Sequence, residues 1–148
     1  MMAYSPSAPT GMKRIFYPDT ETHMQKFVSR KHIGLETNPS SNKLIGVLSR
    51  YDEHPIQKWY NVGLTYDSEQ LKTSPQSFIS INTDDQGVFN TCLENEFALV
   101  ACALEKQKNP DGSPVYNQAQ IYEWLENIRR MGLEQCFRTP LYGEVVST

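Results

Sequence analysis

Only two segments of this 148-residue chain have the composition of β-strands, and a helical segment follows each of them. Residues 77–83, SFISINT, combine apolar and β-branched side chains, and residues 32–37, HIGLET, form a shorter apolar run. Strands that alternate with helices indicate βαβ units and a parallel sheet. Parallel strands are normally covered on both faces, and two of them alone leave unpaired edges. The sequence therefore predicts an α/β fold that is incomplete on its own.

Four segments have the apolar spacing of helices, at residues 20–31, 55–63, 90–106 and 117–132. Pro55 suits a first helical turn, and Gly63 and Gly132 are expected to end their helices. Asn117, followed three residues later by Gln120, predicts a capping box at the start of the last helix. The segments between these helices that are rich in turn-forming or polar residues are predicted to be loops, at residues 38–42, 65–76 and 109–114.

Charge and composition exclude several classes of partner. The formal net charge is -3, so no basic footprint predicts binding to nucleic acid or to an anionic membrane. No apolar run approaches the ~20 residues of a membrane span, and the first residues lack the apolar region of a secretory signal. The three cysteines form no C-x-x-C pair, which favours a reducing cytoplasm over a disulfide or zinc framework.

Two parts of the chain have simpler expectations. Residues 1–18 are expected to be a mobile N-terminal arm, with residues 19–148 as the folded segment. Cys92 and Cys102 fall in an apolar helical stretch and are expected to act as small hydrophobic side chains.

Two adjacent aspartates, Asp84 and Asp85, stand where the strand at residues 77–83 ends and Gly87 permits a turn. One interpretation is a turn with a helix cap, because an acidic side chain at a helix start is favoured. The other is a metal and substrate site, because the chemistry of parallel α/β barrels lies at the carboxyl ends of the strands. A calcium loop is excluded, since Leu93 stands where the twelfth position requires a glutamate. The H-x-E and P-C-x-x-C signature of the zinc deaminases that bind metal through cysteine is absent.

The motifs around the aspartates resemble those of one protein family. SINTDDQGVFNTCLENEF, residues 80–97, resembles the last-strand motif of the adenosine deaminase family, S-x-N-T-D-D-P followed by a Phe and an L-x-x-E-Y. LETNPSSNKLIG, residues 35–46, resembles the preceding strand of the family, and DEHPI, residues 52–56, resembles the loop after it. MGLEQCF, residues 131–137, is similar to the final helix. Order and approximate spacing are kept, so the resemblance covers residues 32–138.

The resemblance implies a (β/α)8 barrel of the TIM type that hydrolytically removes the 6-amino group of adenosine or AMP, with a zinc-bound water as the nucleophile. This chain would form the C-terminal part of such a barrel, about two parallel strands with their flanking helices. In the family the first aspartate of the motif, here Asp84, ligates the metal, and the second, here Asp85, hydrogen-bonds the purine. The implied cofactor is Zn²⁺, and the implied partner is a purine nucleoside or nucleotide.

The chain departs from the family pattern in two ways. Gln86 replaces the usual proline, which loosens the turn. The histidine ligands and the catalytic glutamate of the family lie upstream of the matching region and have no counterpart in this chain. Its three histidines, His23, His32 and His54, are expected to be structural or superficial. Because catalytic zinc takes three or more protein ligands, the chain by itself is expected to be inactive.

Two kinds of function remain open for such a segment. One is to complete a deaminase barrel together with a second chain. The other is a non-catalytic interaction module, or a truncated remnant, that uses exposed strand edges to pair with another chain or with itself. Nearby polar residues have structural explanations: Ser40 and Ser41 are expected in a turn rather than at the barrel mouth, and Glu94 and Glu96 at a helix N-terminus.

Overall fold

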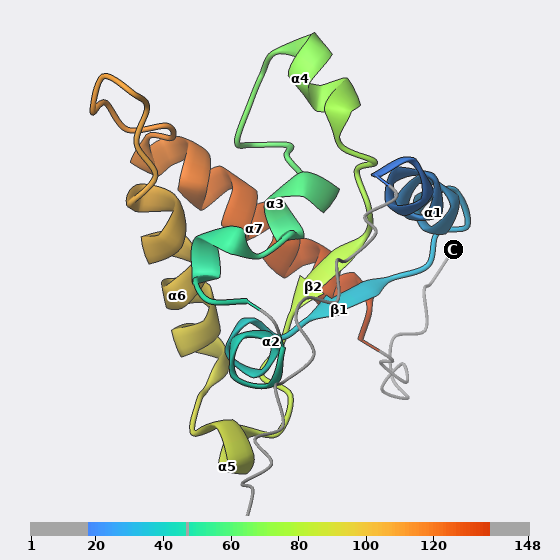
Figure 1. Ribbon diagram of the computed structural model, residues 1–148. Helices are drawn as coiled ribbons and strands as arrows, with labels where there is room; N and C mark the ends of the chain where they lie inside the picture. The colour runs from blue at the N-terminus through green and yellow to red at the C-terminus, as the bar shows by residue number, and fades with distance from the viewer. Residues whose placement is uncertain (1–17, 47, 137–148) are drawn as a thin grey trace, which may run out of the picture.

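The computed structural model describes residues 18–46 and 48–136, which form a mostly helical α/β fold with one small sheet (Figure 1). The elements are, in chain order, α1 (Pro18–Arg30), β1 (Leu35–Thr37), α2 (Pro39–Ile45), the 3-10 helix η1 (Tyr51–Glu53), α3 (Ile56–Trp59), α4 (Ser68–Thr73), β2 (Ile79–Ile81), α5 (Gln86–Phe89), α6 (Leu93–Glu105) and α7 (Gln118–Glu134). The arm expected at residues 1–18 lies, except for Pro18, outside the described residues.

The sheet consists, in the described part of the chain, of β1 and β2 paired in parallel, as the alternation of strands and helices predicts. Glu36 lies opposite Ser80 in the register. Both faces of β2 are covered, because Ile79 and Ser80 point in opposite directions and are 0% and 4% exposed. β1 is less covered, since the side chain of Glu36 is exposed. The parallel α/β arrangement is therefore confirmed, as an open sheet of two strands.

Helices α6 and α7 lie side by side and pack against β2 (Figure 1). The buried apolar side chains form one cluster: Ile56, Leu64, Ile79, Ile81, Val100, Leu104, Ile121, Trp124 and Ile128. Trp124 is completely buried, and its indole N–H donates to the carbonyl oxygen of Tyr60 at 2.8 Å. Burial of one such large side chain contributes about 1.5–3 kcal/mol, so this cluster holds α7 onto the sheet.

Neither glycine that was expected to end a helix does so. α3 already ends at Trp59, and Gly63 lies beyond it with a φ of +101°. A Cβ at Gly63 would come within 2.8 Å of the backbone nitrogen of Trp124, so glycine permits the close approach of this loop to α7. Gly132 lies inside α7, which continues to Glu134, and it packs close to Ser80 of β2.

Two of the three predicted loops contain helices instead. Residues 38–42 include the start of α2, where Pro39 occupies the first helical turn. Residues 65–76 include α4, which Asp67 caps by accepting a hydrogen bond from the backbone N–H of Glu69 at 2.9 Å. The third loop, residues 109–114, is confirmed and is closed by an isolated bridge between Lys108 and Pro114.

The helix predicted at 90–106 begins later than expected. A separate short helix, α5, ends at Phe89, and Asn90 after it takes the left-handed conformation with φ of 48°, so that α6 begins only at Leu93. Cys92 is therefore the residue before α6 rather than part of an apolar stripe, and both Cys92 and Cys102 are exposed. Their expected role as small hydrophobic side chains is wrong.

The start of α7 is as predicted. The Asn117 side chain accepts from the backbone N–H of Gln120, and the Gln120 side chain accepts from the backbone N–H of Asn117, each at 2.9 Å.

None of the helices in the described part of the chain combines the length and apolar character of a membrane span.

A buried carboxylate connects α6 to the start of α2. Glu96 is 0% exposed, and its Oε2 accepts a hydrogen bond from the backbone N–H of Ser40 at 2.8 Å. Its other oxygen accepts from the hydroxyl of Thr91 at 2.5 Å. The side chain of Asn38, which precedes α2, makes no capping hydrogen bond. Glu96 therefore satisfies a free N–H at the start of α2 from a distant part of the sequence, and its negative charge suits the helix N-terminus.

We expect Glu96→Gln to lower the free energy of unfolding by about 1–3 kcal/mol, because an amide replaces a charged acceptor that serves the buried N–H of Ser40 and the half-buried hydroxyl of Thr91. Urea denaturation followed by circular dichroism measures the change. Glu94→Gln is the matched control, since Glu94 lies on the same helical turn with an exposed side chain and should change stability by less than about 0.5 kcal/mol. Equal effects of the two substitutions would show that the Glu96 contact is unimportant.

Candidate functional site

The candidate site lies where the carboxyl ends of the two strands meet. Because β1 and β2 are parallel, the start of α2 and the segment after β2 emerge at the same edge of the sheet. The backbone N–H of Asn82 donates to the carbonyl oxygen of Thr37 at 2.8 Å, which extends the pairing to this edge. Asp84 and Asp85 follow immediately, so the aspartates do stand at the carboxyl end of a parallel strand.

Asp84 is held by a hydroxyl of α2. The Ser41 hydroxyl donates to Oδ2 of Asp84 at 2.8 Å, and Ser41 is 2% exposed. Asp84 itself is exposed and has a φ of 57°, in the left-handed region that non-glycine residues adopt at a cost of roughly 1–2 kcal/mol. The hydrogen bond from Ser41 therefore fixes one carboxylate oxygen of Asp84. Ser41 was expected only in a turn, and its contact with Asp84 arises from the fold.

Asp85 caps a helix. Its Oδ1 accepts a hydrogen bond from the backbone N–H of Val88 at 2.9 Å, at the start of α5. Asp85 is an exposed residue. The interpretation of the acid pair as a turn with a helix cap thus describes the geometry of Asp85, while its contact with a purine stays a prediction.

The described residues do not make a zinc site. No group of three or more His, Cys, Asp or Glu side chains within the described residues is placed to hold a metal ion. Asp84 supplies one carboxylate, and catalytic zinc takes at least three protein ligands. His23 and His32 precede β1 in the sequence, and both are exposed. His54 has both ring nitrogens engaged in hydrogen bonds. The residues present therefore do not fit the metal that the family resemblance implies.

His54 is a buried structural residue, as expected. It is 4% exposed, and the backbone N–H of Ile56 donates to its Nδ1 at 3.3 Å. Its Nε2 lies 3.0 Å from Oδ1 of Asn42, so Nε2 carries the proton and donates it. The same Asn42 oxygen accepts from the backbone N–H of Asn38 at 3.1 Å. This network fixes the start of α2 beside Ser41, and burial lowers the pKa of His54 below its ordinary value of 6.5.

The carboxyl ends of parallel strands are where α/β barrels place their chemistry, and comparison with known proteins indicates a deaminase-like relationship. The chain is 26% identical over 114 residues to an adenosine deaminase of Shewanella denitrificans, across 77% of this chain and 26% of that protein. It is 30% identical over 78 residues to an aminodeoxyfutalosine deaminase of Streptomyces avermitilis, across 53% and 18%. It is 31% identical over 80 residues to an adenosine deaminase of Vibrio vulnificus, across 54% and 20%.

These similarities are distant and partial. The matched region of this chain covers only 18% to 26% of the length of these relatives. No family model matches the chain, and no solved structure matches it. The comparisons thus connect the chain with deaminases without establishing its activity.

The buried His54 predicts a pH dependence of stability. Because its folded-state pKa lies below that of the unfolded chain, the unfolded state binds the extra proton as the pH falls. Stability from this group is complete above about pH 6.5 and is lost below it, by up to about 1.4 kcal/mol per pH unit. Urea titrations from pH 7.5 to about 5.5 in the unaltered chain and in His54→Gln measure the difference. Gln57→Ala, which changes a neighbouring residue without a titratable group, should keep the slope of the free energy of unfolding against pH. An unchanged slope in His54→Gln would contradict the assignment of this pH dependence to His54.

The capping role of Asp85 predicts a contrast between two substitutions. Asp85→Ala should lower the free energy of unfolding by about 0.5–1 kcal/mol through loss of the cap, whereas Asp85→Asn should change it little because asparagine is also a good N-cap. Chemical denaturation of both variants tests this. Equal losses for alanine and asparagine would mean that the charge of Asp85, and not its hydrogen bond to Val88, stabilises α5.

Proposed function

We propose that this chain is the C-terminal part of a (β/α)8 barrel of the adenosine deaminase type, and that it contributes to hydrolytic removal of a purine 6-amino group only when the rest of the barrel is supplied by further polypeptide. In this proposal Asp84 is one metal ligand and Asp85 contacts the purine. Zn²⁺ would be held only together with histidines from outside the described residues. The observation that carries the proposal is the position of the acid pair at the carboxyl end of a parallel strand, with Asp84 oriented by Ser41.

Two further features support an incomplete barrel. β1 and β2 use the backbone groups of alternate residues for their mutual pairing, which leaves the N–H and C=O of Glu36 directed to the outer edge of β1. On α1, the apolar side chains of Met24 and Phe27 are 58% and 50% exposed. Neighbouring strands and helices of a longer barrel would cover both surfaces.

The same open edges favour a second candidate, an interaction module without catalysis. Unpaired strand edges are templates for another strand, from a different chain or from a second copy. This candidate needs no metal, which agrees with the lack of a three-ligand group among the described residues. It requires that the chain associates and that substitution of Asp84 has no effect beyond stability.

A complementation assay tests the two candidates. The purified chain is mixed with a polypeptide that carries the other barrel strands of an adenosine deaminase, with Zn²⁺, and loss of adenosine is followed by absorbance. We expect activity with the unaltered chain and a loss of at least about a hundredfold in Asp84→Asn, since even the partners of metal ligands typically contribute about 10- to 100-fold. Asp111→Asn, in an exposed loop, is the matched control and should retain activity.

Two results would contradict the deaminase proposal. One is a complex that forms, as seen by size-exclusion chromatography, yet shows no zinc-dependent activity. The other is activity that Asp84→Asn leaves unchanged. The first result favours the interaction module. Where the unaltered chain does give activity, Asp85→Asn, which keeps the helix cap, separates a purine contact from a purely structural role.

A further inference from the structure

A second candidate site is formed between α2, η1 and α6, by residues that the deaminase proposal does not use. A cavity of about 320 Å³ lies between α2, η1 and α6. Its apolar walls are Leu99 and Ala103 of α6 and the half-buried ring of Tyr51. Lys43 of α2 and Lys106, which follows α6, both line this cavity.

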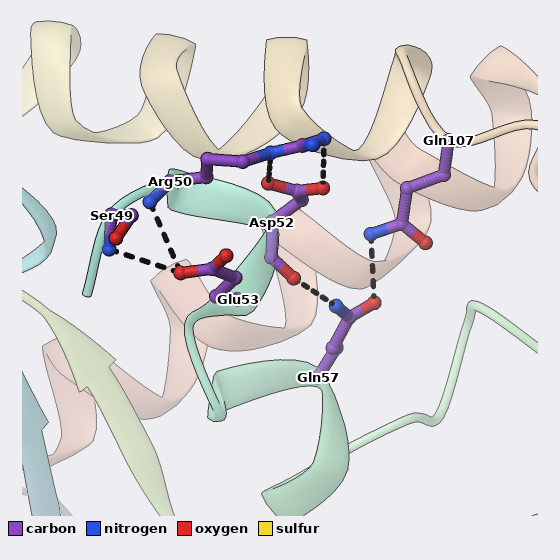
Figure 2. Close-up of polar contacts among 6 residues, drawn as sticks. All are labelled: Ser49, Arg50, Asp52, Glu53, Gln57 and Gln107. Carbon is purple, nitrogen blue, oxygen red and sulfur yellow. Dashed lines mark hydrogen bonds and ion pairs between the residues drawn. The ribbon is translucent and has the colours of Figure 1, made fainter. Parts of the chain in front are cut away.

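The acids near this cavity already have partners (Figure 2). The Arg50 guanidinium binds the Asp52 carboxylate through two hydrogen bonds of 2.8 and 2.6 Å. The Glu53 carboxylate turns back and accepts from the backbone N–H groups of Ser49 and Arg50 at 3.0 and 3.2 Å. Among the described residues, neither carboxylate forms an ion pair with the lysines that line the cavity.

The two lysines have no compensating charge. Neither Lys43 nor Lys106 forms an ion pair with any residue in the described ranges. The Lys43 ammonium lies 4.5 Å from the centre of the Tyr51 ring, a cation–π contact that places the charge while leaving its hydrogens free for an acceptor. The lining thus holds two lysines outside any ion pair, together with the Arg50–Asp52 pair, which is neutral as a unit.

We propose that this cavity binds a small phosphate monoester, with Lys43 and Lys106 at the phosphate and Leu99, Ala103 and Tyr51 around the organic group. A phosphate dianion matches two ammonium charges, and lysine is a common phosphate ligand that acts as a point charge. The volume is at the small end of the range of ligand pockets, about 300–1,000 Å³, which suits a single ring or a short chain. The proposal does not depend on deaminase activity.

Calorimetric titration of the full chain with phenyl phosphate tests the proposal. We expect saturable binding that weakens as salt is added, because ammonium–phosphate attraction is screened. Phenol should not bind and inorganic phosphate should bind more weakly, since each lacks one of the two parts that the cavity recognises. Absence of binding at millimolar phenyl phosphate, or equal binding of inorganic phosphate, would overturn the proposal.

Variants assign the binding to the cavity. The double substitution Lys43→Gln with Lys106→Gln should weaken binding about tenfold or more, given the strength of charge-assisted hydrogen bonds. Lys58→Gln, an exposed lysine on α3 outside this cavity, is the control and should bind normally. If the lysines only stabilise the ends of their helices, the double variant will lose stability while its affinity is unchanged, which refutes the proposal.

Cys102 provides an independent readout because it is a free cysteine that lines the cavity, whereas Cys136 is exposed elsewhere. Bound phenyl phosphate should slow alkylation of Cys102 severalfold and leave Cys136 unaffected, as measured by peptide mass spectrometry. Equal rates at Cys102 with and without phenyl phosphate would place any binding outside this cavity and so contradict the proposal.

Discussion

The buried carboxylate of Glu96 is the contact on which the arrangement of the site depends. It accepts hydrogen bonds from the start of α2 and from Thr91, and it connects the helix after β2 with the helix after β1. Since α2 also supplies Ser41, which orients Asp84, an error in the position of α2 would misplace the acid pair. A buried charge of this kind is tolerated only because its hydrogen-bonding capacity is satisfied, and losing one partner is costly.

The molecule combines a well-packed centre with surfaces that lack partners. Trp124 and Ile128 of α7 and Ile79 of β2 are completely buried in one apolar cluster. The sheet beside them is open at its edges in the described part of the chain, and α1 presents exposed apolar side chains. A fold with this contrast is suited to association, which is common to the two functions considered. They differ in whether the partner brings the missing catalytic groups.

Local patterns predicted the elements whose cause is local. The capping box of Asn117 and Gln120, the apolar stripe of the last helix and the buried strand before Asp84 were all recognisable. Glycine was a poor guide to helix ends, because Gly63 is needed for close approach to α7 and Gly132 packs inside a helix. The helix at residues 39–45 was missed for a different reason, since its N-terminal cap comes from a residue 56 positions away.

The sequence by itself determined the class of fold and the position of the acid pair, because strand composition, helical periodicity and a turn after a strand are properties of neighbouring residues. Tertiary structure alone decided what the acids contact. It brought Ser41 to Asp84 and Glu96 to α2, assigned Asp85 to a helix cap, and gathered Lys43 and Lys106 around one cavity. The Asp85 cap is a local contact that the sequence had offered as one interpretation, but the other contacts join residues far apart in the chain, and their geometry follows from how the helices pack on the sheet, which no local pattern encodes.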